Sequence, residues 1–298
     1  GENLGADTFA ANGVPWPLHQ AATCLCVGGQ PLPLNMISPG AATAQIPWRL
    51  AAGAHKAVLF RAGAASNVLD VSVWPYAPGI FPGAAVRAGA YCQVNAENGV
   101  RPGELLEVYA TGLGAGSSQD PMTEAFVNGI PAEVLYSGMA PGFAGLNQVN
   151  IRVSPLTPPA DSAGLELRIG GAASNSYPLR VASPFDPPGI SLKGPVGEIL
   201  LQAGGPAAPL EVEVEGANAY CGPVLFSLAQ APQGISFRAA VAFTGGAARL
   251  ELWATASARA QSSTLLLYGH APGAASGVLS LRVTVLPSLG AVPVRVVS

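Results

Sequence analysis

The sequence contains an internal repeat, and this repeat restricts the possible folds more than any other feature. The pentapeptide GAASN occurs at Gly63–Asn67 and again at Gly171–Asn175, an offset of 108 (171 − 63). The Leu-Gly pair at 4–5 matches the pair at 113–114, an offset of 109. An ordered series of matches at nearly constant spacing is typical of a duplicated structural unit. The first two thirds of the chain therefore hold two homologous domains in tandem.

The sequence of each copy predicts short strands separated by clusters of Gly, Pro, Asn and Ser. Alternating apolar and polar residues, typical of half-buried strands, occur in AEVLYSG, LNQVNIRV and LELRIGG. The chain has 37 Gly and 28 Pro residues, yet 49% of its residues are hydrophobic, which excludes a disordered protein. Strands at this spacing, without amphipathic helical stretches, favour an all-β protein built from sandwiches.

A third series of strands follows Pro187 without matching the two copies. In LEVEVEG, Glu211, Glu213 and Glu215 are predicted on one face of a strand, and the intervening apolar residues on the other. We predict an all-β chain of three tandem immunoglobulin-like β-sandwiches. The first, 1–78, lacks its opening strand; the second, 79–185, is homologous to it; the third, 186–287, is distinct; and 288–298 forms a C-terminal extension strand.

The two copies resemble a known family. The motifs ISPGAATAQIPWRL, APGIF, GELLEVYATGLG, VNGIPAEVLYSGMAPGFAGLNQVNIRV and GGAASNSYPLRV resemble the Solibacter uncharacterised C-terminal domain, a module of secreted acidobacterial proteins. The resemblance covers residues 1–183 and implies an immunoglobulin-like sandwich, an exported protein and no catalytic residues. The third series is weakly similar to generic bacterial immunoglobulin-like modules.

The second copy has a strand that the first copy lacks. Arg101–Ala110 precedes the TGLG motif of the second copy, whereas the first copy starts at the matching GENLG with nothing before it. We therefore expect an open edge beside Asn3, Leu4 and Gly5, and an open edge invites pairing with another chain.

The C-terminal segment Leu289–Ser298 has the pattern of the missing strand. Val292, Val294 and Val296 alternate with Pro293, Arg295 and Val297, so the three valines share one face. We predict that this segment is a donor strand that enters the first domain of the next copy, and that the identical subunits form a head-to-tail filament.

Two alternatives stay open from the sequence. In one, the chain is a fragment whose first strand lies outside the given sequence. In the other, related to it, the domains are spacer, adhesive or carbohydrate-binding modules of a larger secreted protein. Trp16, Trp48, Trp74 and Trp253 are candidates for a sugar-binding platform if exposed, although core packing is the commoner use of tryptophan.

The cysteines predict an oxidising compartment. Their number is even and no CxxC or Cys/His cluster occurs, so we expect disulfides among Cys24, Cys26, Cys92 and Cys221. Cys24 and Cys26 match Glu124 and Phe126 of the second copy, which predicts that both face outward. We expect Cys92 to pair with one of the two and Cys221 with the other across a subunit contact; two intrachain bridges are the open alternative.

No catalytic, cofactor or metal site is predicted. His19, His55 and His270 lie in separate contexts, and the aspartates are scattered turn residues that do not predict a calcium site. The net charge of −3 gives no basic patch for nucleic acid, and no apolar run is long enough to span a membrane. We expect a non-enzymatic, extracellular or cell-surface protein whose signal peptide has been removed, with its surface or carbohydrate ligand unknown.

Overall fold

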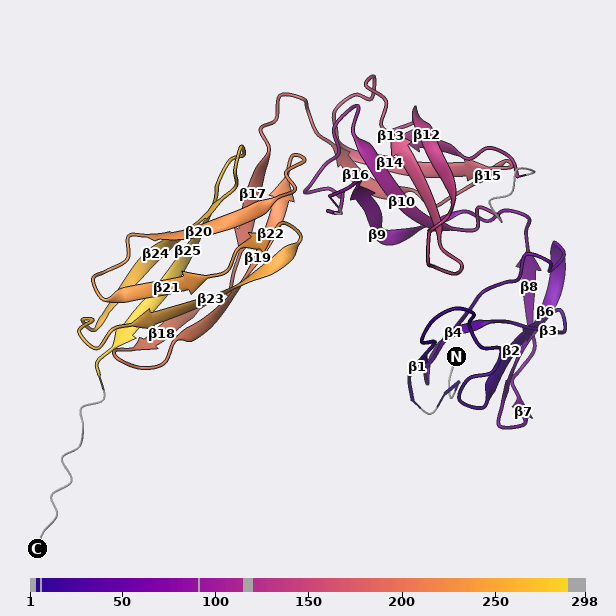
Figure 1. The fold of residues 1–298 in the computed structure, drawn as a ribbon, viewed down its shortest axis with the longest axis horizontal. Coiled ribbons are helices and arrows are strands. Elements are labelled where there is room, and N and C mark those ends of the chain that lie inside the picture. Colours follow the sequence, from indigo (N-terminus) through magenta and orange to yellow (C-terminus); the bar gives the residue numbers. More distant parts are fainter. Residues whose placement is uncertain (1–3, 6, 91, 115–119, 289–298) are drawn as a thin grey trace, which may run out of the picture. The chain divides into compact units, whose positions relative to one another are not determined.

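The computed structural model describes residues 4, 5, 7–90, 92–114 and 120–288. Figure 1 shows a chain of strands and connecting loops, and the described residues contain no helix. Accordingly, no described helix has the length and hydropathy needed to cross a membrane. The predicted all-β fold class is confirmed.

The first sandwich consists of two small sheets. One has the order β1-β4-β5 and contains β1 (Phe9–Ala10), β4 (Leu34–Ile37) and β5 (Ala42–Ala44). The other has the order β3-β2-β6-β7, with β8 also pairing with β6. Its strands are β2 (Thr23–Val27), β3 (Gln30–Pro31), β6 (Gly53–Arg61), β7 (Ala64–Ala65) and β8 (Leu69–Val73). A small apolar core between strands contains Val27, Leu32, Leu50 and Ala57.

The second sandwich is one eight-stranded sheet that folds over at β12. Its order is β15-β14-β11-β12-β13-β10-β9, and β16 pairs with β14. β12 pairs with β11 at its start and with β13 along the rest, and a β-bulge between Val134 and Tyr136 marks an irregularity in that second pairing. The strands are β9 (Gly79–Arg87), β10 (Leu105–Thr111), β11 (Glu124–Val127), β12 (Ile130–Met139), β13 (Asn147–Arg152), β14 (Ala160–Ile169), β15 (Ala172–Ala173) and β16 (Tyr177–Val181).

The two GAASN segments adopt the same local structure. In the first, the Ser66 hydroxyl accepts a hydrogen bond from Leu59 N at 3.0 Å and donates to Asn67 O at 2.7 Å. In the second, the Ser174 hydroxyl accepts from Leu167 N at 3.0 Å and donates to Asn175 O at 2.7 Å. These serines cap the corner between equivalent strands, which explains why the pentapeptide is retained in both copies.

The third sandwich has immunoglobulin topology. One sheet has the order β17-β19-β23-β21 and the other β18-β25-β24-β20-β22. By position in the sheets these are the A-B-E-D and A′-G-F-C-C′ arrangements of an immunoglobulin sandwich, except that β22 at position C′ follows β21 at position D in the chain. The strands are β17 (Gly189–Lys193), β18 (Glu198–Gln202), β19 (Ala208–Ala217), β20 (Pro223–Ala229), β21 (Ile235–Ala239), β22 (Ala242–Phe243), β23 (Gly246–Ala254), β24 (Gln261–His270) and β25 (Gly277–Leu286).

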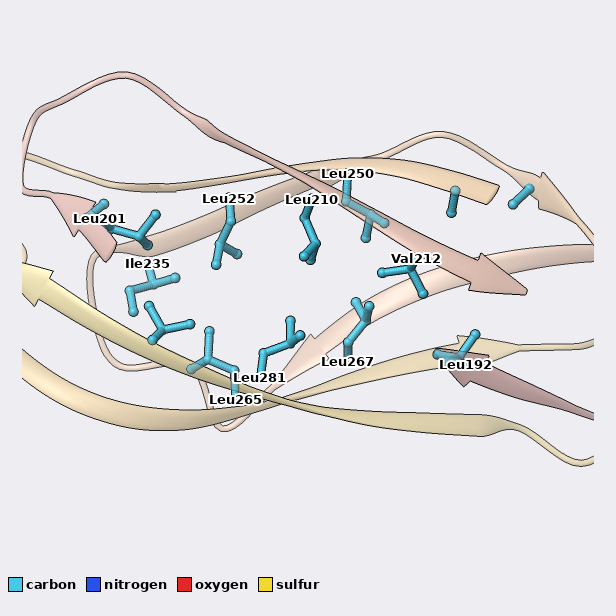
Figure 2. Packing of buried hydrophobic residues seen from close by; sticks show 14 of the residues in the cluster. Leu192, Leu201, Leu210, Val212, Ile235, Leu250, Leu252, Leu265, Leu267 and Leu281 are labelled. Carbon is cyan, nitrogen blue, oxygen red and sulfur yellow. The ribbon is translucent and has the colours of Figure 1, made fainter. Parts of the chain in front are cut away.

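The core of the third sandwich lies between these two sheets. Figure 2 shows side chains of both layers pointing toward one another, among them Leu210 and Leu250 from one sheet and Leu265 and Leu281 from the other. On β19 the apolar residues Leu210, Val212 and Val214 are buried, whereas the glutamates between them point away from the core, as predicted.

One motif of the third sandwich escaped the sequence comparison. GAAS recurs at Gly273–Ser276, an offset of 102 (273 − 171) from the second copy, and it again connects the last two long strands. This tetrapeptide lacks the Asn of GAASN, and the prediction that the third domain is distinct stays a prediction.

Contacts group the chain into two compact units. One holds the residues up to 84 with 105–152 and 164–177, and the other holds 85–104, 153–163 and the residues from 178 onward. Both units take residues from the segment 79–185, so this division follows packing rather than the sequence repeat. The predicted boundaries of the three domains stay a prediction.

Candidate functional site: an open edge of the first sandwich

The second sandwich shows how a complete copy of the repeat is closed. Its β10 lies between β9 and β13, and Leu106, Val108 and Ala110 point into the core, where they are fully buried. In the pairing with β13, Leu106 lies opposite Ile151 and Val108 lies opposite Val149. β10 therefore pairs with the edge of β13 and continues its buried apolar face.

In the first sandwich, no described strand pairs with the equivalent edge. The β4–β5 hairpin repeats the register of β12–β13, with the β-bulge at the same place, so that Ala42 and Ala44 correspond to Val149 and Ile151. Val149 and Ile151 are 0% exposed, whereas Ala42 and Ala44 are only half-buried. Ile46 and Trp48, which follow β5, are 38% and 59% exposed. β5 is the last strand of its sheet, and no strand among the described residues pairs with its outer edge. The counterpart of β10 is what this edge lacks.

A second edge of the first sandwich is open in the same way. In the second sandwich, Val100 runs parallel to β16: its N–H donates to Arg180 O at 2.9 Å, and its carbonyl accepts from Ala182 N at 2.8 Å. The corresponding strand β8 pairs with β6 alone within the described part of the chain. Leu69 on β8 is 58% exposed, whereas its counterpart Tyr177 on β16 is 4% exposed.

The first sandwich has a third uncovered place, a surface depression, and the second sandwich shows what fills the equivalent place. On the second sandwich, the connecting segment before β9 is held by Tyr76, whose hydroxyl donates to Asp120 Oδ1 at 3.0 Å, and by Ala77 N, which donates to Gly112 O at 2.9 Å. The Tyr76 ring packs closely on Gly114 and Gly170.

On the first sandwich, an open depression lies at the place that corresponds to the Tyr76 site of the second. It is lined by Leu4, Leu59, Arg61, Ala62, Ala64, Ala65 and Ser66. Leu4 and Ala62 are the counterparts of Leu113 and Gly170. At these three places, no described residue covers the first copy in the way that segments of the chain cover the second.

The predicted edge residues lie close to this region. Leu4 N donates to Pro39 O at 3.0 Å, and Leu4 O accepts a hydrogen bond from Thr23 Oγ1 at 3.2 Å. Gly5 is buried, and a Cβ there would lie 2.8 Å from Ile37 Cγ2. Asn3 and the donor valines Val292, Val294 and Val296 lie outside the described residues. The sequence comparison missed the edge of β5: the sequences align Ile46 and Trp48 with Val149 and Ile151, whereas the strand register places Ala42 and Ala44 there.

The cysteine pairing differs from the prediction. Cys92 and Cys221 form an intrachain disulfide with a Cα–Cα distance of 6.0 Å, and Cys24 and Cys26 are free thiols. The expected pairing of Cys92 and Cys221 with the other two cysteines is therefore wrong. The physical reason is proximity: the segment after β9 packs against the end of β19, which brings these two residues together although they are 129 positions apart.

Polar contacts surround the disulfide. Arg101 Nη2 donates to Asp186 O at 2.6 Å and to Asn218 O at 3.1 Å, while Arg180 Nη2 donates to Asp186 Oδ2 at 2.7 Å. Ala219 N donates to Asn98 Oδ1 at 3.1 Å. We call these six residues the polar clamp; with the disulfide it fixes the segments 98–101, 180–186 and 218–221 to one another.

The free cysteines lie side by side on β2, with 3.6 Å between their sulfur atoms. They share one face with Phe60 and Val58, their direct partners on β6. Cys24 is buried rather than exposed, because the residue opposite it is Phe60, where the second copy has Arg168. Burial, followed by the hydrogen bond and charge of Cys26, raises the pKa of Cys24 from 9.0 to about 11.

The described residues contain no group of three or more His, Cys, Asp or Glu side chains that could hold a metal ion. His19 and His270 are exposed, and His55 bonds Ala51 O at 2.7 Å. Trp48 and Trp74 are exposed, whereas Trp16 and Trp253 are partly buried.

No family model matches the chain, and no curated protein matches it in sequence. It is similar in structure to domains 4–9 of the surface layer protein SbsC, with 11% identity and a TM-score of 0.25 over 94% of this chain and 42% of that one. The chain thus spans less than half the length of that structure. It is also similar to SGBP-B of the Bacteroides ovatus mixed-linkage glucan utilization locus, with 12% identity and a TM-score of 0.28 over 89% of this chain and 60% of that one. InvD of Yersinia pseudotuberculosis matches 69% of this chain and 57% of its own, with 12% identity and a TM-score of 0.29.

Proposed function

We propose that the protein is a non-catalytic, exported structural subunit that polymerises head to tail, by inserting Leu289–Ser298 of one copy into the open edge of the first sandwich of the next. The observation that carries this proposal is the outer edge of β5, which has no partner among the described strands and is followed by the exposed Ile46 and Trp48, whereas the second copy pairs the equivalent strand β13 with β10. Strand addition to such an edge supplies main-chain hydrogen bonds and apolar burial together.

The pattern of the tail fits the vacancy. β10 fills its site with Leu106, Val108 and Ala110, one apolar residue at every second position. Val292, Val294 and Val296 have the same spacing. In the register of β10 the first two would lie opposite Ala44 and Ala42 of the next copy, and burial of the three valines would contribute on the order of 5 kcal/mol.

The geometry of this contact favours a filament. The donor segment follows the third sandwich and the acceptor edge belongs to the first, so the two surfaces differ. A contact between two different surfaces of identical subunits leaves one free donor and one free acceptor, and it propagates unless the rotation closes a ring. The disulfide supports export, because such bonds persist in oxidising compartments, and the family resemblance implies the same location.

Charge substitutions on each side of the contact test the proposal. Ile46→Asp places a carboxylate in the acceptor edge, and Val294→Asp places one in the donor strand. Phe243→Asp is the matched control, since Phe243 is an exposed aromatic residue of the third sandwich. We expect fibres of uniform width by electron microscopy for the unmodified chain and the control, and monomers by analytical ultracentrifugation for the other two variants.

A mixture of the two defective variants sharpens the test. Ile46→Asp retains its donor and Val294→Asp retains its acceptor, so an equimolar mixture should give dimers and no longer species. Isolated particles of the unmodified chain at every concentration would contradict the proposal. That outcome would favour the alternative, in which these are spacer or adhesive modules of a larger secreted protein and an adjoining segment covers the edge.

A further inference from the structure

We infer that the Cys92–Cys221 disulfide is a covalent load path, which carries tension along the chain around residues 93–220. A pull applied at the two ends of the chain reaches Cys92 from the first sandwich. The bridge then passes it directly to Cys221, which is 129 positions further along the chain. The intervening residues are not extended by tension, because none of them lies on the stretched part of the covalent chain.

The residues inside this loop include most of the second sandwich. β10 to β16 and the strands β17 to β19 of the third sandwich all lie between the two cysteines. The polar clamp joins the same segments, with Arg101 and Arg180 both bonded to Asp186 beside the bridge. The extensible part of the chain is therefore limited to the residues before Cys92 and after Cys221.

The bridge also decides how the third sandwich is loaded. Tension enters at Cys221, just before β20, and leaves after β25. β24 is antiparallel to both strands, so β20 and β25 run parallel to each other in one sheet. Pulling the start of one and the end of the other shears the sheet, so the ladders of β20·β24 and β24·β25 bear the load together instead of opening pair by pair.

Single-molecule stretching of the full chain, held by its two ends, tests this load path. At about 3.6 Å per residue, the loop hides about 46 nm of chain, so the oxidised protein should reach a final contour length about 46 nm shorter than the same protein after addition of a thiol reductant. Opening of the third sandwich in the oxidised chain should release about 24 nm, from Cys221 to the end of β25, rather than the about 35 nm expected from Gly189 onward.

Two variants separate this disulfide from the free thiols. Cys92→Ser with Cys221→Ser should show the long contour length without reductant, and Cys24→Ser with Cys26→Ser should behave as the unmodified chain does. Reduction of the unmodified chain gives the same comparison if the first variant does not fold. Equal final lengths with and without reductant, or a 35 nm event in the oxidised chain, would overturn the inference. The result is independent of filament formation, because it concerns a single chain.

Discussion

Gly112 and Gly129 share a left-handed backbone conformation, with φ of +74° at both, but their surroundings differ. A Cβ at Gly112 would lie 1.9 Å from Ala77 O, whereas a Cβ at Gly129 would meet no heavy atom within 4 Å. Gly129→Ala should therefore cost about 1–2 kcal/mol from backbone strain alone. Gly112→Ala should cost more than about 3 kcal/mol, because Ala77 must also move. Urea unfolding of both variants measures the difference, and equal losses would contradict the close approach of Ala77.

Arg87 and Glu104 form a buried ion pair in the second sandwich, with 2.6 Å between Arg87 Nε and Glu104 Oε1. Burial lowers the pKa of Arg87, and the charge of Glu104 acts in the opposite direction. Glu104→Gln leaves a buried guanidinium without its counter-charge, so we expect a loss of about 3 kcal/mol in the free energy of unfolding. Glu133→Gln breaks the exposed pair with Arg152 and should cost less than about 1 kcal/mol. Comparable losses in the two variants would be inconsistent with a buried pair.

The raised pKa of Cys24 predicts both its reactivity and a pH dependence of stability. A folded-state pKa above the unfolded value stabilises the protein below about pH 9, and this contribution is lost as the pH rises toward 11. Alkylation of Cys24 at pH 8 should be at least about tenfold slower than in the unfolded chain, since the thiolate is the reactive form. Mass spectrometry of the alkylated protein measures this rate, and Cys24→Ser should remove this part of the pH dependence.

The strands β5 and β13 occupy equivalent positions but differ in their neighbours. β13 lies between β10 and β12, whereas β5 has a partner only in β4 among the described strands. Hydrogen exchange of 42–44 should therefore be at least about tenfold faster than that of 149–151 in the monomer. The amides of Ser66 and Ser174, which bond Leu59 O and Leu167 O at 2.8 Å, provide an internal control and should exchange alike. Similar protection of 42–44 and 149–151 in a monomer would show that the edge is already covered.

The pairing of β18 with β25 shows why the partner of a strand is harder to predict than the strand itself. β18 is parallel to β25, although their nearest ends are 75 positions apart in the chain (277 − 202), and it thereby joins the sheet opposite to β17. Alternation in the sequence predicts both strands, but their own residues do not specify which sheet each one joins. That choice depends on which apolar faces remain uncovered after the other strands have packed.

For the chain as a whole, the disulfide is the strongest constraint on unfolding. Closing a loop of 129 positions removes conformational freedom from the unfolded state, which corresponds to about 5 kcal/mol at 25 °C. Cys92→Ser with Cys221→Ser should therefore lower the midpoint of thermal unfolding of the residues around the polar clamp. Cys24→Ser with Cys26→Ser serves as the matched control and should have a smaller effect. Differential scanning calorimetry of both double variants measures the shift, and an unchanged transition in the first would contradict a structural role for the bridge.

The sequence alone was sufficient for the all-β fold, the duplicated corner at GAASN and the orientation of β19. These features depend on local patterns: alternation places Val212 inward and Glu213 outward, and each serine bonds residues within one short turn. The comparison of the two copies also led to the predicted open edge, because the second copy has a strand, β10, for which the first shows no counterpart among the described residues.

The disulfide partners and the exposed pair Ile46 and Trp48 depend on the packed molecule instead. Four cysteines allow three pairings, and the correct one follows from contacts between residues that are far apart in the chain. Ile46 and Trp48 belong to an apolar segment that predicts burial, and they are exposed because no described strand lies against them. Local patterns determine which face of a strand is apolar, but the tertiary structure determines whether anything covers that face.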